Sequence, residues 1–271
     1  MARARKQVEE IATSHRQRGS SRRAVKEEML VVKPPIKEKF VAERTPPPVQ
    51  AKTEKQKTYL RYLNDPNVKA VVCLGYHGTG KTFIAASVAA DKLRSNQIEK
   101  IIVARPYVQT GKTAGYRPGT TLEKLYPYVR NVLDTIKSRI GSAAYQIALD
   151  DGLRGAIEVQ DIESIRGRSF DQPSVLIIDE SQQTTPEEMM SIVTRMSDQC
   201  LLILCGDIRQ KDIQGQSGME WFLSFSKRHN LQGVEVVDFD SPDDIVRGGL
   251  VREIAIGMMK DLERKVNNAT N

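Results

Sequence analysis

Six short apolar runs alternate along the chain with longer segments in which apolar residues recur at helical spacing. The runs are residues 69–74, 100–104, 157–159, 175–178, 201–205 and 234–239. Runs that are apolar at every position, such as 175–178, are typical of strands buried on both faces of a parallel sheet. The other segments predict helices near 53–63, 81–94, 121–139, 221–225 and 249–266, with one more from Pro186. The pattern predicts an α/β fold with a mainly parallel sheet flanked by helices.

Composition agrees with a globular chain of 271 residues, of which 39% are hydrophobic and 28% charged. No apolar run approaches the length of a membrane helix and no secretory leader is visible, so we expect a cytoplasmic protein without membrane contact. Cys73, Cys200 and Cys205 lie in or beside predicted strands and are expected to be small core residues. Pro127 falls inside the predicted helix 121–139, where we expect it to interrupt the helix.

The basic charge of the chain is concentrated at its N-terminus. Residues 1–45 contain twelve Lys/Arg and six Asp/Glu, whereas the rest of the chain is nearly neutral. Three prolines, 46–48, follow this segment. We therefore predict a basic, proline-rich flexible arm over residues 1–50 and one folded domain over 51–271. The arm alone fits either an electrostatic contact with nucleic acid or a solvated tail.

The first apolar run, residues 69–74, is followed by a glycine-rich loop that leads into a predicted helix. Gly75 to Thr82 matches G-x-x-x-x-G-K-[ST], the Walker A phosphate loop, with a strand before it and a helix after it, as the motif requires. Backbone N–H groups of such a loop surround a β-phosphate, Lys81 bridges the β- and γ-phosphates, and Thr82 holds Mg²⁺. The nucleotide contacts are expected from all eight residues: Gly75, Tyr76, His77, Gly78, Thr79, Gly80, Lys81 and Thr82.

Two further strand ends carry polar residues. The run 175–178 leads into Asp179 and Glu180, which is the Walker B arrangement. Asp179 is expected to hold the Mg²⁺ shell and Glu180 to polarise an attacking water. After the run 201–205, Gln210 is the expected contact of the γ-phosphate.

Other polar residues are open to two interpretations. Gln56 could read the adenine edge, although spacing alone favours a surface glutamine beside a core tyrosine, Tyr59. Arg247 could be an arginine finger or could form a salt bridge. Lys112, Arg117 and Lys124 could form a surface for nucleic acid or a partner, or could lie in a solvated loop. Arg166 and Arg168 could contact nucleotide or nucleic acid, or could lie in a solvent-facing turn.

These motifs, taken together, resemble the PhoH-like family of P-loop ATPases, which is related to the first RecA-like domain of superfamily 1 helicases. The resemblance runs from about Thr53 to Glu253. It rests on the Walker A loop and on Arg105-Pro106, Tyr126-Pro127-Tyr128, Arg166-Gly167-Arg168, Asp179-Glu180-Ser181-Gln182, Gly206-Asp207-Ile208-Arg209-Gln210 and Asp244-Ile245-Val246-Arg247. Tyr76-His77 departs from it, because the family usually has Pro-Ala there.

The resemblance implies a single RecA-like P-loop domain that binds ATP and Mg²⁺ and acts as a metal-dependent ATPase. It also implies an association with RNA, and some relatives form hexameric rings. The chain has room for one RecA-like domain, so we expect a homo-oligomer in which Arg247, Arg166 or Arg168 reaches a neighbouring subunit. The catalytic residues are then Lys81, Glu180, Gln210 and Arg247. Two alternatives stay open: a nucleotide-gated binding module without catalysis, and a small-molecule phosphotransferase.

Overall fold

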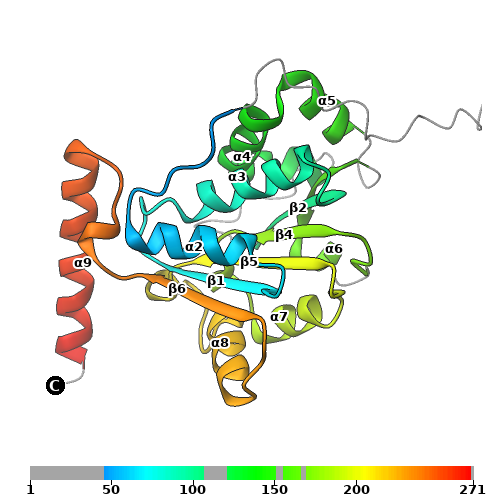
Figure 1. The fold of residues 1–271 in the computed structure, drawn as a ribbon. Helices are drawn as coiled ribbons and strands as arrows, with labels where there is room; N and C mark the ends of the chain where they lie inside the picture. Colours follow the sequence, from blue (N-terminus) through cyan, green and yellow to red (C-terminus); the bar gives the residue numbers. More distant parts are fainter. Residues whose placement is uncertain (1–45, 107–120, 151–154, 166–168, 270–271) are drawn as a thin grey trace, which may run out of the picture. The chain divides into compact units, whose positions relative to one another are not determined.

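All six predicted strands form, and they join into one sheet in the order β3-β2-β4-β5-β1-β6 (Figure 1). The computed structural model describes residues 46–106, 121–150, 155–165 and 169–269. Every pairing within the sheet is parallel. The strands are β1 (Ala70–Gly75), β2 (Lys100–Arg105), β3 (Ile157–Asp161), β4 (Ser174–Ile178), β5 (Cys200–Gly206) and β6 (Val234–Phe239).

Helices cover both faces of the sheet. On one face lie α2 (Glu54–Asn64), α3 (Lys81–Arg94), α4 (Thr121–Ile140) and α5 (Ser142–Asp150), and on the other α6 (Ile162–Ile165), α7 (Pro186–Val193) and α8 (Gly218–Arg228) (Figure 1). Short 3₁₀ turns follow three strands: η3 (Ser181–Gln183), η4 (Ile208–Gln210) and η5 (Pro242–Asp244). The helix α9 (Gly249–Ala269) closes the described fold.

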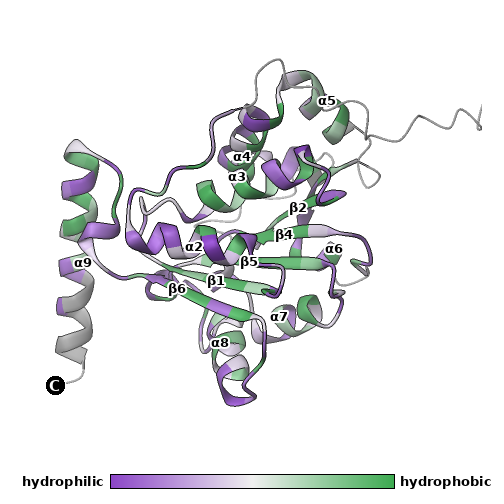
Figure 2. Ribbon diagram, viewed as in Figure 1, coloured by the Kyte–Doolittle hydropathy of each residue, from purple (hydrophilic) through white to green (hydrophobic). Residues whose placement is uncertain are grey.

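The core is built from alternate faces of the central strands. Val72, Leu176 and Leu202 point toward α6, α7 and α8, where Met189 and Phe222 complete one buried cluster. The hydropathy view shows the central strands as apolar along their length (Figure 2). The three cysteines are buried in this core, as predicted.

The expected interruption at Pro127 is wrong, because α4 continues through it from Thr121 to Ile140. Proline removes one helical hydrogen bond. A stripe of buried side chains holds α4 to the rest of the domain nevertheless: Leu125, Val129, Val132, Leu133 and Ile136. Burial of that stripe offsets the loss of a single bond in the second turn.

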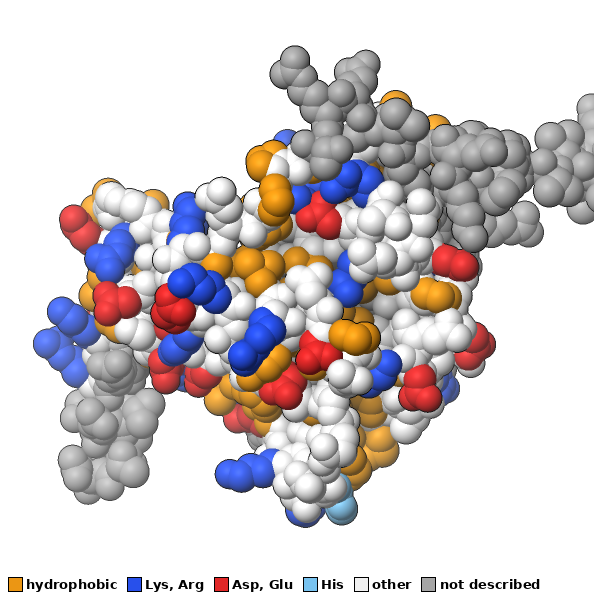
Figure 3. Space-filling model, viewed as in Figure 1, with side chains coloured by type: hydrophobic (Ala, Val, Ile, Leu, Met, Phe, Trp, Pro, Cys, Tyr) orange, Lys and Arg blue, Asp and Glu red, His pale blue; other side chains and the backbone are white. Residues whose placement is uncertain are grey.

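The charge of the described domain is mixed in sign. Basic and acidic side chains are interspersed over the face shown in Figure 3, consistent with the near-neutral count outside residues 1–45. The predicted basic arm lies outside the described residues over 1–45. Within the described part of the chain, no helix combines the length and the apolar character needed to cross a bilayer.

The topology brings the ends of four strands together. β1 pairs with β5, β5 pairs with β4, and β4 pairs with β2, so the loops after these parallel strands emerge at one edge. Open α/β sheets bind ligands at this edge.

Candidate nucleotide-binding site

The loop between β1 and α3 needs glycine for its backbone. Gly75, Gly78 and Gly80 have φ angles of 123°, 83° and 85°. Gly75 is also crowded, since a Cβ there would lie 2.3 Å from the carbonyl oxygen of Phe239. The N-cap of α3, Gly80, supplies no side-chain hydrogen bond. The first-turn N–H groups of α3 are therefore left to bind an anion.

Lys81 is folded into this loop. Its side chain is buried, and its Nζ donates to the carbonyl oxygens of Gly75 at 2.5 Å and Tyr76 at 2.8 Å. The ammonium is thus held inside the curl of the loop, where a phosphate bound by the backbone N–H groups would meet it.

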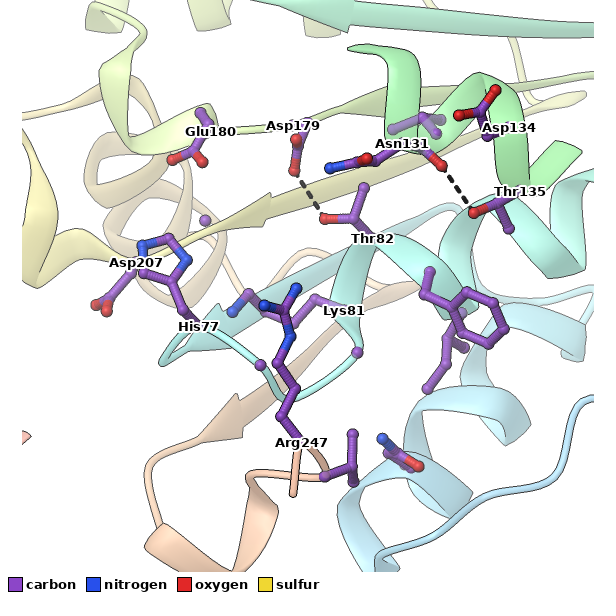
Figure 4. A pocket seen from close by; sticks show the side chains of 18 of the residues that line it. His77, Lys81, Thr82, Asn131, Asp134, Thr135, Asp179, Glu180, Asp207 and Arg247 are labelled. Carbon is purple, nitrogen blue, oxygen red and sulfur yellow. Dashed lines mark hydrogen bonds between the residues drawn. The ribbon is translucent and has the colours of Figure 1, made fainter. Parts of the chain in front are cut away.

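The Walker A and Walker B residues meet directly. The Thr82 hydroxyl donates a 2.8 Å hydrogen bond to Oδ1 of Asp179 (Figure 4). Burial, together with the adjacent charge of Glu180, raises the pKa of Asp179, although the Thr82 bond and the cations Arg105 and Lys81 oppose the shift. A hydroxyl and a carboxylate are hard oxygen ligands, so the residues present fit Mg²⁺.

Glu180 has a left-handed backbone conformation, with φ 54°. Its Oε2 accepts a 2.6 Å hydrogen bond from the Gln182 side chain, and its Oε1 lies 3.6 Å from a nitrogen of Arg105. A non-glycine residue held at positive φ marks a position with a special geometric requirement. Here the turn places a second carboxylate beside Asp179 in the lining of the pocket.

The third strand end forms a polar cluster around Asp207, which is buried. Gln210 donates through Nε2 to Asp207 at 2.9 Å, and its Oε1 shares a short hydrogen bond with Nε2 of His77. Arg209 also binds Asp207, at 2.8 Å, and its guanidinium lies 3.6 Å above the Tyr76 ring. The expected γ-phosphate contact, Gln210, is therefore tied to the Walker A loop.

Gln56 is not the surface glutamine that its spacing favoured, because only 3% of it is exposed. Its Nε2 donates to the Thr79 carbonyl at 2.8 Å, and its Oε1 accepts from the Lys52 N–H at 2.7 Å. Tyr59, in contrast, is fully buried as expected. Gln56 thus holds the phosphate loop in place and also lines the pocket.

Arg247 lies against the same loop. The N–H of Val246 donates to the Gly78 carbonyl at 3.1 Å, and the Arg247 side chain passes 3.4 Å from where a Cβ of Gly78 would be. Among the ion pairs of the described residues, none includes Arg247. The alternative of a salt bridge therefore finds no support, and the guanidinium points into the pocket (Figure 4).

Most of the predicted site residues line a pocket of about 760 Å³, but Gly75, Tyr76, Thr79 and Gln210 are not among its lining residues. The volume is within the usual size of ligand sites. Figure 4 shows Lys81, Thr82, Asp179, Glu180 and Arg247 converging on it. The pocket also has a wall that the sequence did not predict: Arg105, Tyr128, Asn131, Val132, Asp134 and Thr135. The one available signal was the place of Arg105 at a strand end. Lys112, Arg117, Arg166 and Arg168 lie outside the described residues, and Lys124 is on α4.

Comparison with known proteins finds a family model that matches most of this chain. The family model described as PhoH-like protein matches residues 48–258. A PhoH-like protein of Bacillus subtilis is 32% identical over 208 residues, covering 76% of this chain and 62% of the relative. Protein PhoH of Escherichia coli K12 is 34% identical over 166 residues, covering 61% and 46%. The chain thus spans less than two thirds of each relative's length.

One of the solved structures that align with this chain is the HK97 bacteriophage large terminase. It aligns with a TM-score of 0.46 and 14% identity, covering 86% of this chain and 50% of the terminase chain. The Pif1 helicase from Candida albicans aligns with a TM-score of 0.35 and 16% identity, covering 72% and 41%.

Proposed function

The chain belongs to the PhoH-like protein family, and we propose that it binds ATP with Mg²⁺ and hydrolyses it to ADP and phosphate. The observation that carries this proposal is the 2.8 Å contact between Thr82 and Asp179, with Glu180 next in the chain. A phosphate loop, a metal-binding pair and a candidate base for water thereby share one pocket.

Binding follows from the groups already in place. The N–H groups of the loop and of the first turn of α3 receive the β-phosphate. Lys81 exchanges its bonds to the Gly75 and Tyr76 carbonyls for bonds to the β- and γ-phosphates. Thr82 and Asp179 would hold Mg²⁺, which would supply positive charge beside the phosphates. Gln56 holds the loop through its hydrogen bond to Thr79, and its side-chain amide is proposed to make further hydrogen bonds to the adenine.

Hydrolysis needs a base beside the γ-phosphate. Glu180 is proposed to orient a water and accept its proton as the water oxygen attacks the γ-phosphorus and ADP leaves. Gln210, which follows the neighbouring parallel strand β5, is proposed to contact the γ-phosphate from the same edge of the sheet. Arg247 supplies positive charge to the phosphates, because it lies against Gly78 and has no anionic partner among the described residues.

The proposal includes coupling of ATP turnover to RNA or another single-stranded nucleic acid, either as a helicase or by remodelling RNA. Its support is the basic arm, in which twelve Lys/Arg accompany six Asp/Glu over residues 1–45. An enzyme that consumes ATP acts where ATP is supplied, so the proposed location is the cytoplasm.

A homo-oligomer, with a hexamer as one form, is also proposed. The helix α9 exposes three apolar side chains at a spacing of four residues: Leu250 (69% exposed), Ile254 (53%) and Met258 (53%). Such a stripe on one helix face favours association. A second copy of this chain is the proposed occupant of the stripe. A monomer at micromolar concentration in analytical ultracentrifugation, with and without ATP, would contradict this part.

The test is phosphate release by purified protein with Mg²⁺ and ATP, with and without single-stranded RNA. The account predicts that phosphate is released without any added phosphoryl acceptor, and that the rate of release increases when RNA is present. A small-molecule phosphotransferase would require an acceptor for turnover. A binding module without catalysis would bind ATP and release no phosphate, and that result would overturn the enzymatic proposal.

A further inference from the structure

Three parts of the fold meet at the side chain of Arg105, the last residue of β2. Its Nη1 lies 3.3 Å from Oδ2 of Asp179, and its Nη2 lies 3.6 Å from Oε1 of Glu180. The same Nη1 donates a 2.9 Å hydrogen bond to the carbonyl oxygen of Tyr128 on α4. One guanidinium therefore links both Walker B carboxylates to a helix on the pocket wall.

The sheet holds this arrangement in place. β2 and β4 are neighbours in register, with Ala104 opposite Ile178, and the Asp179 N–H donates to the Ala104 carbonyl at 3.0 Å. Arg105 and Asp179 thus leave adjacent strand ends side by side. A planar guanidinium has five donors in a fixed fork, which lets it serve two carboxylates and a carbonyl together.

The helix at the other end of the link forms part of the nucleotide pocket. α4 contributes Tyr128, Asn131 and Thr135 to the pocket lining. Its first turns also carry the exposed rings of Tyr126 and Tyr128, at 40% and 37% exposure. Breaking or strengthening the hydrogen bond between Arg105 and the Tyr128 carbonyl would therefore alter α4 both where it lines the pocket and where it is exposed to solvent.

We propose that Arg105 is a positioning residue that couples nucleotide occupancy of the pocket to the N-terminal half of α4. This inference rests on the proposed binding of ATP and Mg²⁺. Within the described residues, Arg105 is the cation that ion-pairs with Asp179 and Glu180. When a divalent cation shares these carboxylates, their attraction for the guanidinium weakens. Arg105 then redistributes toward phosphate oxygens or toward the Tyr128 carbonyl.

A purely structural ion pair makes a different prediction. It would stabilise the fold equally with and without nucleotide, and lysine would replace arginine at little cost. Under our proposal lysine keeps the charge beside the carboxylates but loses the fork that reaches Tyr128 at the same time. Arg105→Lys is therefore the more informative variant, and Arg105→Ala removes the link entirely.

The experiment is hydrogen exchange of peptides within residues 121–140, with and without Mg²⁺ and a slowly hydrolysed ATP analogue. Arg228→Ala is the matched control, because Arg228 is an exposed arginine on α8. For wild type and this control, nucleotide is expected to change exchange in the first half of α4 by about threefold or more. Arg105→Lys, measured at an analogue concentration that saturates it, is expected to lose that change.

Two results would overturn the inference. One is a wild type that binds the analogue with no change in α4, and the other is an Arg105→Lys variant that keeps the full change. Failure of the wild type to bind the analogue at all would contradict the proposed function as well. Thermal melts of each variant identify loss of folding, and Arg105→Lys keeps the test decisive if Arg105→Ala does not fold.

Discussion

The hydroxyl of Thr82 lies 2.8 Å from the carboxylate of Asp179, although 97 positions separate the two residues in the chain. The contact joins the first turn of α3 to the end of β4, across the intervening strand β5. Two motifs that were recognised separately are therefore parts of one site. The predictions below concern the groups that surround this contact.

Acidification is expected to weaken Mg²⁺-dependent nucleotide binding at a higher pH than an ordinary carboxylate would allow. Burial, and next the charge of Glu180, raise the pKa of Asp179. A raised pKa means that protonation begins earlier as the pH falls, and the protonated group is a poor metal ligand. Titration of ATP binding against pH, with and without Mg²⁺, measures this. Asp179→Asn should remove the pH-dependent part of the Mg²⁺ effect on ATP binding. If the Mg²⁺ effect on wild-type affinity stayed constant down to the pH at which exposed carboxyl groups titrate, that result would contradict the prediction.

Gly75→Ala is expected to lower the free energy of unfolding by about 2 kcal/mol or more. The new Cβ would meet the Phe239 carbonyl at 2.3 Å, in addition to the strain of a φ of 123°. Gly141→Ala is the matched control, since Gly141 has a φ of 89° with open space around it. It should cost about 1 kcal/mol, from backbone strain alone. Denaturant melts compare the two variants, and equal losses would contradict the role of crowding.

His77→Ala is expected to reduce the turnover number several-fold while leaving nucleotide affinity nearly unchanged. The backbone N–H groups and Lys81 remain, but Gln210 loses one of its two side-chain partners, His77, and keeps Asp207. A double-mutant cycle with Gln210→Ala should give a coupling energy of about 0.5–1.5 kcal/mol in the activation free energy. Strictly additive effects on turnover would show that the two residues act independently.

Lys81→Ala is expected to weaken ATP binding by about tenfold or more, because the β- and γ-phosphates lose their main cationic neutraliser. Lys227→Ala, at an exposed position in the last turn of α8, is the control and should bind like wild type. Equilibrium binding of a fluorescent ATP analogue measures both. Wild-type affinity in Lys81→Ala, with normal folding, would mean that nucleotide binds elsewhere.

The sheet and the phosphate loop could be predicted from sequence because local patterns determine them. β4 and β5 were predicted to within one residue at each end, since buried parallel strands are apolar at nearly every position. β3 was predicted less completely, because it continues into the polar residues Gln160 and Asp161. Lys81 could be assigned to the phosphate loop from the same local pattern, because its partner Gly75 is part of the same short motif.

The rest depends on partners that are distant in the chain. Gln56 is buried because its amide reaches the Thr79 carbonyl, 23 positions later. Arg105 belongs to the site because of Asp179 and a backbone carbonyl on α4, neither of which a pattern around Arg105 reveals. Continuity of α4 through Pro127 likewise depends on packing, which outweighs a local propensity.

The most direct test of the central claim is single-turnover ATP hydrolysis by Glu180→Gln, compared with Glu187→Gln as a control at an exposed position in the first turn of α7. If Glu180 activates the attacking water, Glu180→Gln should bind ATP and Mg²⁺ like wild type. It should release phosphate about 100-fold or more slowly, whereas the control stays near the wild-type rate. Phosphate release by Glu180→Gln at the wild-type rate would contradict the account.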